Sequence, residues 1–346
     1  MPIPYTKPHL DFSQQVSLLR SRGMSFKDTQ KAESILSSTG YYHLSAYWFP
    51  FRKIDLATNT ALDDFIPGVS FEDVCSLMWF DSCLRSILFE MLTDIELWLR
   101  CSIAYETGKR DPAGYFTGAC IDSIFLPGGN KQHIRSMWIS KLSQQIQNSK
   151  EVFIEHFHNK YLPPMPVWVC CEVWDFGMSS NLYNMLSRSY KNAIASRLGI
   201  RSSALLASWL HAMNTVRNIC AHNARLWNRR IASRPQIPNA QNMLALSFLS
   251  QKGYAPESLA TITFITVWLH RQIAPYSAKH QELKAHLDSL SAIALPGLAH
   301  SMMGFQTGWE TEAVWGTAAK ARSNGSKKYA HTFNSSILKK WNYRQR

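Results

Sequence analysis

The sequence has few of the features that mark secreted or membrane-spanning proteins. Its 346 residues include seven cysteines, an odd number without a Cys-x-x-Cys pair, which argues against a disulfide framework. The longest apolar candidate, Leu259 to Leu269, is interrupted by threonines and is shorter than the ~18 residues that a membrane span needs. The first residues lack the basic start and apolar stretch of a signal peptide. We therefore expect a reduced, cytoplasmic protein that does not enter a membrane.

Acidic residues are scarce in two parts of the chain. Lys and Arg outnumber Asp and Glu by 37 to 24, which gives a net charge of +13. Residues 313–346 contain eight Lys or Arg and no acid, and a second stretch without acids separates Asp175 from Glu257. A polyanion such as nucleic acid is therefore a candidate partner, although a basic tail can also serve solubility alone.

Helical periodicity, in contrast, is abundant. Apolar residues recur at alternating spacings of three and four from Val74 to Trp98, after a possible cap formed by Ser70 and Asp73, which predicts a long helix packed in a bundle. Shorter helices are predicted at about 13–21, 27–37, 132–147, 151–158, 167–174, 181–186, 190–198, 203–216 and 257–272. No strand-type alternation is found. The predicted fold class is all-α, with an N-terminal helical region (1–68), a helical-bundle domain (69–312) and a basic tail (313–346).

One segment, Thr215–Arg230, combines four arginines, a histidine and three asparagines at the end of an apolar helix. Arg217 would lie about 140° from His222 around a helix. If the helix continues, the residues that share one face are Asn218, His222, Arg225 and Arg229. Because no acid lies nearby in the sequence, this cluster is typical of a phosphate-binding site.

Histidine beside arginine suits a particular reaction. The imidazole titrates near neutral pH, and guanidinium groups stabilise charge that develops on phosphoryl oxygens, so the pair could cleave RNA through the ribose 2′-hydroxyl without a metal. The competing interpretation is a solvated basic helix end, which the helix dipole favours. The expected RNA-binding residues are Arg225, Asn228, Arg229, Arg230, Lys327, Lys328, Lys339 and Lys340. No cofactor is expected, and no metal, because His156 and His158 would face different ways on a helix.

A family resemblance strengthens the catalytic interpretation. Residues Arg217 to Arg229 read R-N-x-x-A-H-x-x-R-x-W-N-R, an extended form of the Rx4–6H motif of HEPN ribonucleases, and the chain resembles the Abi-like abortive-infection proteins of bacteria (the AbiD/AbiF group). Further agreeing stretches are Lys7-Pro8 with Leu18-Leu19, Tyr41 to Arg52, Phe71-Glu72-Asp73, Phe80-Asp81 with Leu84-Arg85, Ile95-Glu96 with Leu99-Arg100, and Pro166 to Ser179.

The resemblance implies a HEPN-like helical domain that acts as a homodimer in phage defence. Two motifs would meet across a cleft and form a composite, metal-independent endoribonuclease site. Arg217 and His222 would be catalytic and Asn218 their polar companion. Many relatives have a second histidine where this chain has Asn223, and asparagine cannot shuttle protons. Some relatives pair with a structured noncoding RNA, which the basic tail would suit.

Several residues keep two interpretations. Glu96 and Arg100 could orient the motif helix or touch RNA, or they could simply brace the bundle as an i, i+4 pair. Asp81 lies on an apolar stripe and should pair with Arg85. Trp227 could stack on a base or close the helix onto the core.

Two functions other than cleavage also fit the sequence. The first is a non-catalytic RNA-binding protein that holds a dedicated structured noncoding RNA. The second is a helical interaction protein whose basic end binds an acidic partner protein.

Overall fold

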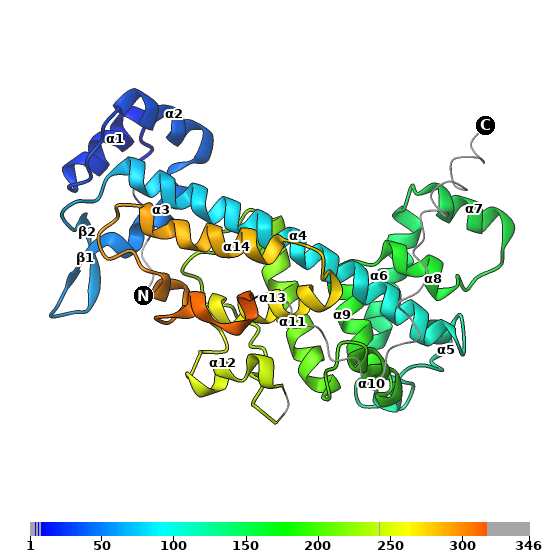
Figure 1. Cartoon of the computed structure of the whole chain (residues 1–346). Coiled ribbons are helices and arrows are strands. Elements are labelled where there is room, and N and C mark those ends of the chain that lie inside the picture. Colours follow the sequence, from blue (N-terminus) through cyan, green and yellow to red (C-terminus); the bar gives the residue numbers. More distant parts are fainter. Residues whose placement is uncertain (1–3, 5, 7, 242, 317–346) are drawn as a thin grey trace, which may run out of the picture. The chain divides into compact units, whose positions relative to one another are not determined.

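Helices form most of the computed structural model, which describes residues 4, 6, 8–241 and 243–316 (Figure 1). The helices are α1 (Phe12–Ser21), α2 (Thr29–Thr39), α3 (Tyr41–Trp48), α4 (Phe71–Gly108), α5 (Gly114–Thr117), α6 (Gln132–Asn148), α7 (Val152–Lys160), α8 (Val167–Cys170), α9 (Phe176–Met185), α10 (Arg188–Ser196), α11 (Ser203–Ala221), α12 (Phe248–Gln251), α13 (Leu259–Ile273) and α14 (Lys279–Asp288). The strands β1 (Arg52–Asp55) and β2 (Thr60–Phe65) form an antiparallel hairpin. The predicted all-α fold class is confirmed, with this hairpin as an addition.

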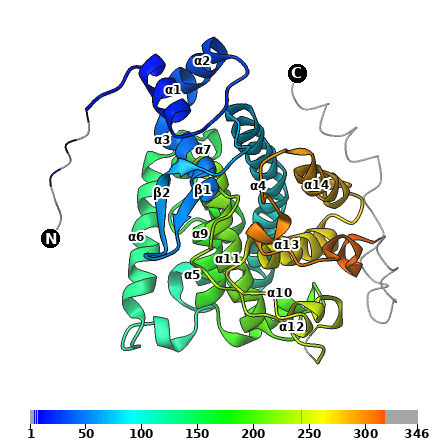
Figure 2. The same cartoon turned by 90° about the vertical axis from the view of Figure 1, so that its left-hand side faces the viewer.

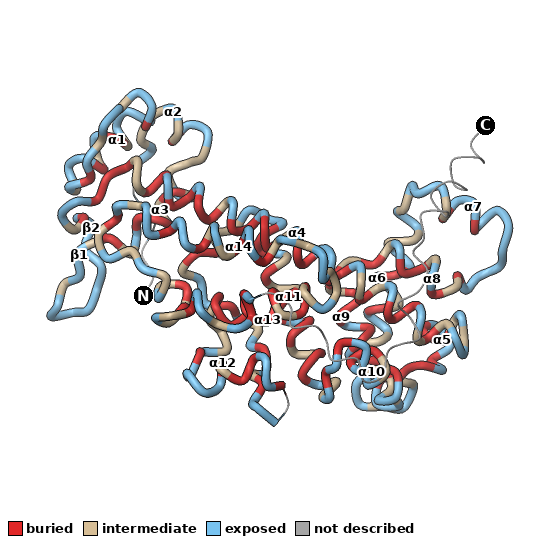
Figure 3. The backbone as a smooth tube through the Cα atoms, in the orientation of Figure 1, coloured by how far each residue is buried: buried red, intermediate tan, exposed pale blue. Residues whose placement is uncertain are grey.

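Helix α4 is the centre of the fold. The Ser70 hydroxyl accepts a hydrogen bond from the backbone N–H of Asp73 at 3.0 Å, so the predicted cap is present. The helix extends over 38 residues, further than the periodic stretch that ended at Trp98. Helices α3, α9, α11, α13 and α14 pack against it (Figures 1 and 2). Buried residues gather where these helices meet (Figure 3), which explains why α4 is apolar on several sides.

The N-terminal region packs on the first turns of α4. The backbone N–H of Lys27 donates to the Glu72 carboxylate at 2.9 Å, and the β2 residue Phe65 donates its N–H to the carbonyl of Arg22 at 2.8 Å. The hairpin itself is mostly exposed. Because neither strand buries a whole face, it lacks the apolar alternation that would reveal strands in the sequence.

Most of the other predicted helices are observed with small shifts. The differences are of three kinds: α9 begins at Phe176 instead of 181, the helix predicted at 167–174 ends at Cys170 and continues as a 3-10 turn, and α3, α5, α12 and α14 form where no helix was predicted. In the described part of the chain, no helix is long and apolar enough to cross a membrane.

Residues Met1–Trp315 group into one unit. The boundaries drawn at 68/69 and 312/313 stay predictions. The four tail lysines proposed for RNA binding, Lys327, Lys328, Lys339 and Lys340, lie outside the described residues.

Candidate active site

The motif helix α11 ends at the motif itself. His222 is its C-cap residue, and Asn223 adopts a left-handed backbone conformation with φ of 51°. The N–H of Asn223 donates to the carbonyl of Cys220 at 3.2 Å, and that of Ala224 donates to Ile219 at 3.1 Å. These two bonds form the capping pattern known as the Schellman motif, for which asparagine is the usual alternative to glycine.

This ending corrects one prediction. Arg225 and Arg229 do not continue the helix, so they do not share a helical face with Asn218 and His222. The side chains of Asn218 and His222 stay exposed on the last turn and at the cap. Asn223 therefore ends the helix through its left-handed backbone conformation.

Arg217 points toward α4 and not toward His222's side of the helix. Its Nε lies 3.5 Å from Oε2 of Glu96, and its guanidinium lies over the ring of Phe89, 5.7 Å from the centroid. Arg100 pairs with the other carboxylate oxygen of Glu96. The predicted pair of Glu96 and Arg100 is confirmed, and the structure adds that the same buried carboxylate holds Arg217.

The Arg217 side chain is 26% exposed, whereas that of Glu96 is 5% exposed. The Arg217 Nε makes no hydrogen bond among the described residues, and Nη1 donates only to the Asn218 side-chain oxygen, at 3.4 Å. The buried Nε thus faces the Glu96 carboxylate, which orients the guanidinium, and the Nη groups are the donors that remain for an anion.

Asp81 anchors the segment that follows the helix. It is fully buried and accepts hydrogen bonds from the backbone N–H groups of Leu226 at 3.0 Å and Trp227 at 2.7 Å. The Tyr47 hydroxyl donates to it at 2.8 Å and Arg85 at 2.5 Å. The predicted Asp81–Arg85 pair is therefore confirmed. The same carboxylate also fixes the backbone of Leu226 and Trp227.

Trp227 belongs to the core. It is fully buried and stacks between Tyr47 and Phe51, with ring centroids 6.5 and 6.2 Å away. Of the two interpretations of this tryptophan, closing the chain onto the core is the one that the structure supports. It leaves the ring no free face for a nucleobase.

The arginines after the helix have partners that the sequence pattern does not reveal. Arg225 donates to the carbonyl of Ala46 at 3.2 Å, and burial lowers the pKa of its guanidinium. Arg230 forms an ion pair with Glu257 at 3.2 Å. Arg229, which is exposed, donates only to the carbonyl of Arg225, at 3.3 Å. The absence of acids nearby in the sequence therefore does not leave Arg217, Arg225 and Arg230 without partners, because their partners come from segments distant in the sequence.

The remaining residues of the cluster are placed as follows. Asn228 is a second residue with a left-handed backbone conformation, with φ of 49°, and it is partly buried.

At the helix end, burial raises the pKa of the Cys220 thiol to about 12, so this thiol stays protonated and uncharged at neutral pH. The His222 side chain is exposed, and within the described residues its imidazole takes part in no hydrogen bond or ion pair.

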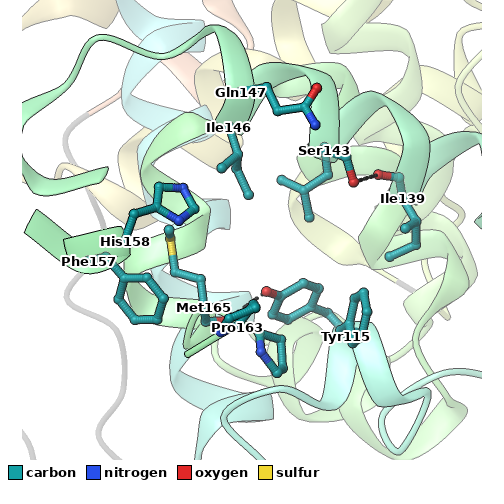
Figure 4. Close-up of a pocket in the computed structure, with 12 residues that line it drawn as sticks. Tyr115, Ile139, Ser143, Ile146, Gln147, Phe157, His158, Pro163 and Met165 are labelled. Atoms are coloured by element: carbon teal, nitrogen blue, oxygen red, sulfur yellow. Dashed lines mark hydrogen bonds between the residues drawn. The ribbon is translucent and has the colours of Figure 1, made fainter. Parts of the chain in front are cut away.

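A metal-ligating group or a cavity beside this cluster would bear on its chemistry. In the described residues, no group of three or more His, Cys, Asp or Glu is placed to hold a metal ion. A cavity of about 340 Å³ lies between α6, α7 and the Pro163–Met165 segment (Figure 4), with Tyr115, Phe157 and Met165 among its walls. Its lining contains neither Lys nor Arg and no residue of α11, so it does not belong to the cluster around His222.

The fold and these contacts define a class: an α-helical protein in which two buried carboxylates of one long helix order an Arg–Asn–x–x–x–His helix end. The chain matches the family model described as "Abi-like protein" over residues 34–228, more than half of its length. It therefore belongs to the Abi-like family, which links it to abortive infection, a form of phage defence. Comparison with curated proteins and with solved structures gave no match.

Proposed function

We propose that this protein is a HEPN-type endoribonuclease of an abortive-infection system, with Arg217 and His222 as catalytic residues. The observation that carries the proposal is the environment of these two residues. Arg217 is oriented by the buried Glu96 at 3.5 Å from its Nε, its Nη groups make one long hydrogen bond (3.4 Å, to Asn218) among the described residues, and His222 is an exposed histidine at the same helix end. A guanidinium held by a buried carboxylate and an exposed imidazole at the same helix end are groups suited to phosphoryl transfer.

The reaction would proceed without a metal. The His222 imidazole accepts the proton of the ribose 2′-hydroxyl, and the 2′ oxygen attacks the adjacent phosphorus. The bond from phosphorus to the 5′ oxygen breaks, and that oxygen takes up a proton from an imidazolium. The products are a 2′,3′-cyclic phosphate and a 5′-hydroxyl end. Arg217 donates to the phosphoryl oxygens, on which negative charge increases in the transition state.

A homodimer completes this proposal. Each chain supplies one motif histidine, since Asn223 cannot transfer protons, while the reaction needs a base and an acid. Two motifs that meet across a dimer would provide one imidazole for each role. In such a dimer, Arg217, which is paired with Glu96 of α4, would contact the phosphate whose ribose 2′-hydroxyl is bound by His222 of the partner subunit.

The test is cleavage of total RNA in EDTA by the wild-type protein and by His222→Ala. The matched control is His156→Ala, which removes an exposed histidine of α7. We expect fragments with 2′,3′-cyclic phosphate ends from the wild type and the control, and none from His222→Ala. Equal cleavage by all three proteins, or cleavage only with added metal, would refute the proposed mechanism.

The non-catalytic alternative predicts a different result. A protein that only holds RNA would leave RNA intact with or without His222, and one defined RNA would co-purify with it. The exposed Arg229 and the basic tail would serve that function equally well, so the cleavage assay is what separates the two.

A further inference from the structure

A second basic site lies at the other end of the motif helix. A cavity of about 600 Å³ is formed by α10, the turn that follows it and the first residues of α11. Arg188, Lys191 and Arg201 line it, and Asp122 is the one acid among its lining residues. The site therefore carries an excess of positive charge in a hollow of the size that ligands occupy.

The three cations of this cavity have few acidic partners among the described residues. Within the described residues, Arg188 and Arg201 form no ion pair, and the Lys191 ammonium donates to the backbone carbonyl of Asn184 at 3.3 Å. Both arginines are exposed. Three positive charges beside a single carboxylate leave guanidinium and ammonium donors free for a phosphate.

The walls of the cavity are held in place. The Tyr183 hydroxyl donates to the carbonyl of Lys191 at 3.1 Å and to that of Ser203 at 3.3 Å, and so it ties α10 to the start of α11. The N-cap Ser202 and the first residues of α11, Ser203 and Ala204, line the same cavity, where the helix dipole adds to the field of the three cations.

A stripe of exposed and partly exposed residues runs along α11 from this cavity to the candidate catalytic histidine, and at Thr215 the hydroxyl is hydrogen-bonded to that of Ser233 at 2.7 Å. The stripe consists of Ala204, Ala207, His211, Thr215, Asn218 and His222, all exposed or partly exposed. Their spacings of three and four place them on one side of α11. Its first two members line the cavity and its last is the helix cap. At 1.5 Å per residue, the two ends lie about 27 Å apart.

We propose that this cavity binds a backbone phosphate of single-stranded RNA several nucleotides away from the cleaved bond. The strand would run along the exposed stripe of α11 between the cavity and His222. The inference rests on the proposed ribonuclease function and deepens it: the enzyme would prefer RNA long enough to reach both ends of the helix. We call Arg188, Lys191 and Arg201 the distal phosphate site.

The experiment compares two triple variants of equal charge. Arg188→Ala/Lys191→Ala/Arg201→Ala removes the distal phosphate site, and Lys27→Ala/Lys31→Ala/Lys150→Ala removes three exposed lysines, none of which lines this cavity. Affinity is measured by fluorescence anisotropy in the His222→Ala background, so that the RNA stays intact. The probes are single-stranded RNAs of about 12 and about 4 nucleotides, near the limits of known single-strand sites.

We expect the distal-site variant to bind the longer RNA at least about tenfold more weakly than the control variant. The slope of log affinity against log salt should become shallower by about 0.7 for each phosphate that the variant no longer neutralises. The shorter RNA, which cannot span the helix, should bind both variants alike. Thermal unfolding checks the fold, and if the triple variant unfolds, Arg188→Ala/Arg201→Ala, which changes only exposed side chains, takes its place.

Three results would overturn the inference. If wild type cleaves RNA but both variants bind the longer RNA alike, the distal site is wrong and the ribonuclease proposal stands. If the shorter RNA loses as much affinity as the longer one, the cavity is part of the cleavage site and not a distal site. If the wild-type protein neither binds nor cleaves RNA, both proposals fail together.

Discussion

Asp81 is the residue on which the order of the motif segment most depends. Its carboxylate is fully buried and holds Tyr47, Arg85 and the backbone of Leu226 and Trp227. Removing it leaves the guanidinium of Arg85 buried without a counter-charge. The loss of one partner from a buried pair costs about 3–5 kcal/mol.

We therefore predict that Asp81→Ala lowers the free energy of unfolding by about 3–5 kcal/mol, measured by urea denaturation. Glu90→Ala is the matched control, because Glu90 lies on the same helix, is 57% exposed and pairs with Lys279 at the surface. Surface pairs contribute at most about 1 kcal/mol. Similar losses in the two variants would show that the Asp81 contacts do not stabilise the fold in the way described.

Glu96 tests whether a buried carboxylate positions a catalytic arginine. Glu96→Gln keeps the volume of the side chain but removes the charge that attracts Arg217 and Arg100. Because misplacing a reacting group by about 1 Å can cost 100-fold in rate, we expect a fall in kcat of up to about 100-fold on RNA.

The comparison for this variant is Glu90→Gln, which should retain the wild-type rate. If Glu96→Gln cleaves RNA as fast as wild type but unfolds more easily, the residue braces the bundle and does not position Arg217. That result would decide between the two interpretations that the sequence left open for Glu96 and Arg100.

At the scale of elements, the end of α11 is set by backbone conformation. Asn223 has φ of 51°, a region that non-glycine residues enter at a cost of roughly 1–2 kcal/mol and β-branched residues avoid. We predict that Asn223→Val lowers the free energy of unfolding by about 1–2 kcal/mol, measured by urea denaturation.

Asn223→Gly is the control, because glycine adopts this conformation freely, and its free energy of unfolding should stay close to that of the wild-type protein. A valine variant as stable as the glycine variant would mean that the helix end is not conformationally fixed. Histidine also tolerates the left-handed region, so Asn223→His should fold normally.

The elements also show what the sequence could and could not predict. Helix α4 could be predicted because burial along one long helix leaves a regular apolar pattern. Its cap at Ser70 could be predicted from the Ser and Asp three residues apart. The hairpin could not be predicted, because its strands are mostly exposed. The helix end at Ala221 was missed because asparagine in a left-handed turn has a weaker sequence signal than glycine.

The sequence predicted the cations of the candidate site but not the residues that pair with them. The acid-free stretch contains the motif arginines, but Glu96 and Glu257, which pair with Arg217 and Arg230, come from outside that stretch. Spacing within one segment cannot reveal partners brought in by tertiary packing. A charged residue on an apolar stripe was the available signal, and it did point to Asp81.

At the scale of the molecule, segments far apart in the sequence meet around one helix. Tyr47 and Phe51 from the N-terminal region stack with Trp227, which follows α11, and the backbone of Trp227 is bound by the Asp81 carboxylate of α4. These segments carry the resemblance to the Abi-like family and fall within the matched residues 34–228. The contacts give a physical reason why they occur together: each completes the packing or hydrogen bonding of the others.

The composite-site proposal makes a prediction for the whole assembly. If each cleavage site needs the histidines of two chains, a heterodimer of a wild-type and a His222→Ala chain holds only one motif imidazole and should be inactive. Wild type is therefore mixed with increasing amounts of His222→Ala through a dissociation and reassociation step. We expect the rate of cleavage per wild-type chain, measured in an EDTA-containing assay, to fall in proportion to the fraction of wild-type chains in the mixture. A rate per wild-type chain that does not change on mixing would mean that each chain cleaves RNA with its own Arg217 and His222. The test is needed because Arg217 is paired with Glu96 of α4, so that an arginine and a histidine from different chains are part of the proposal.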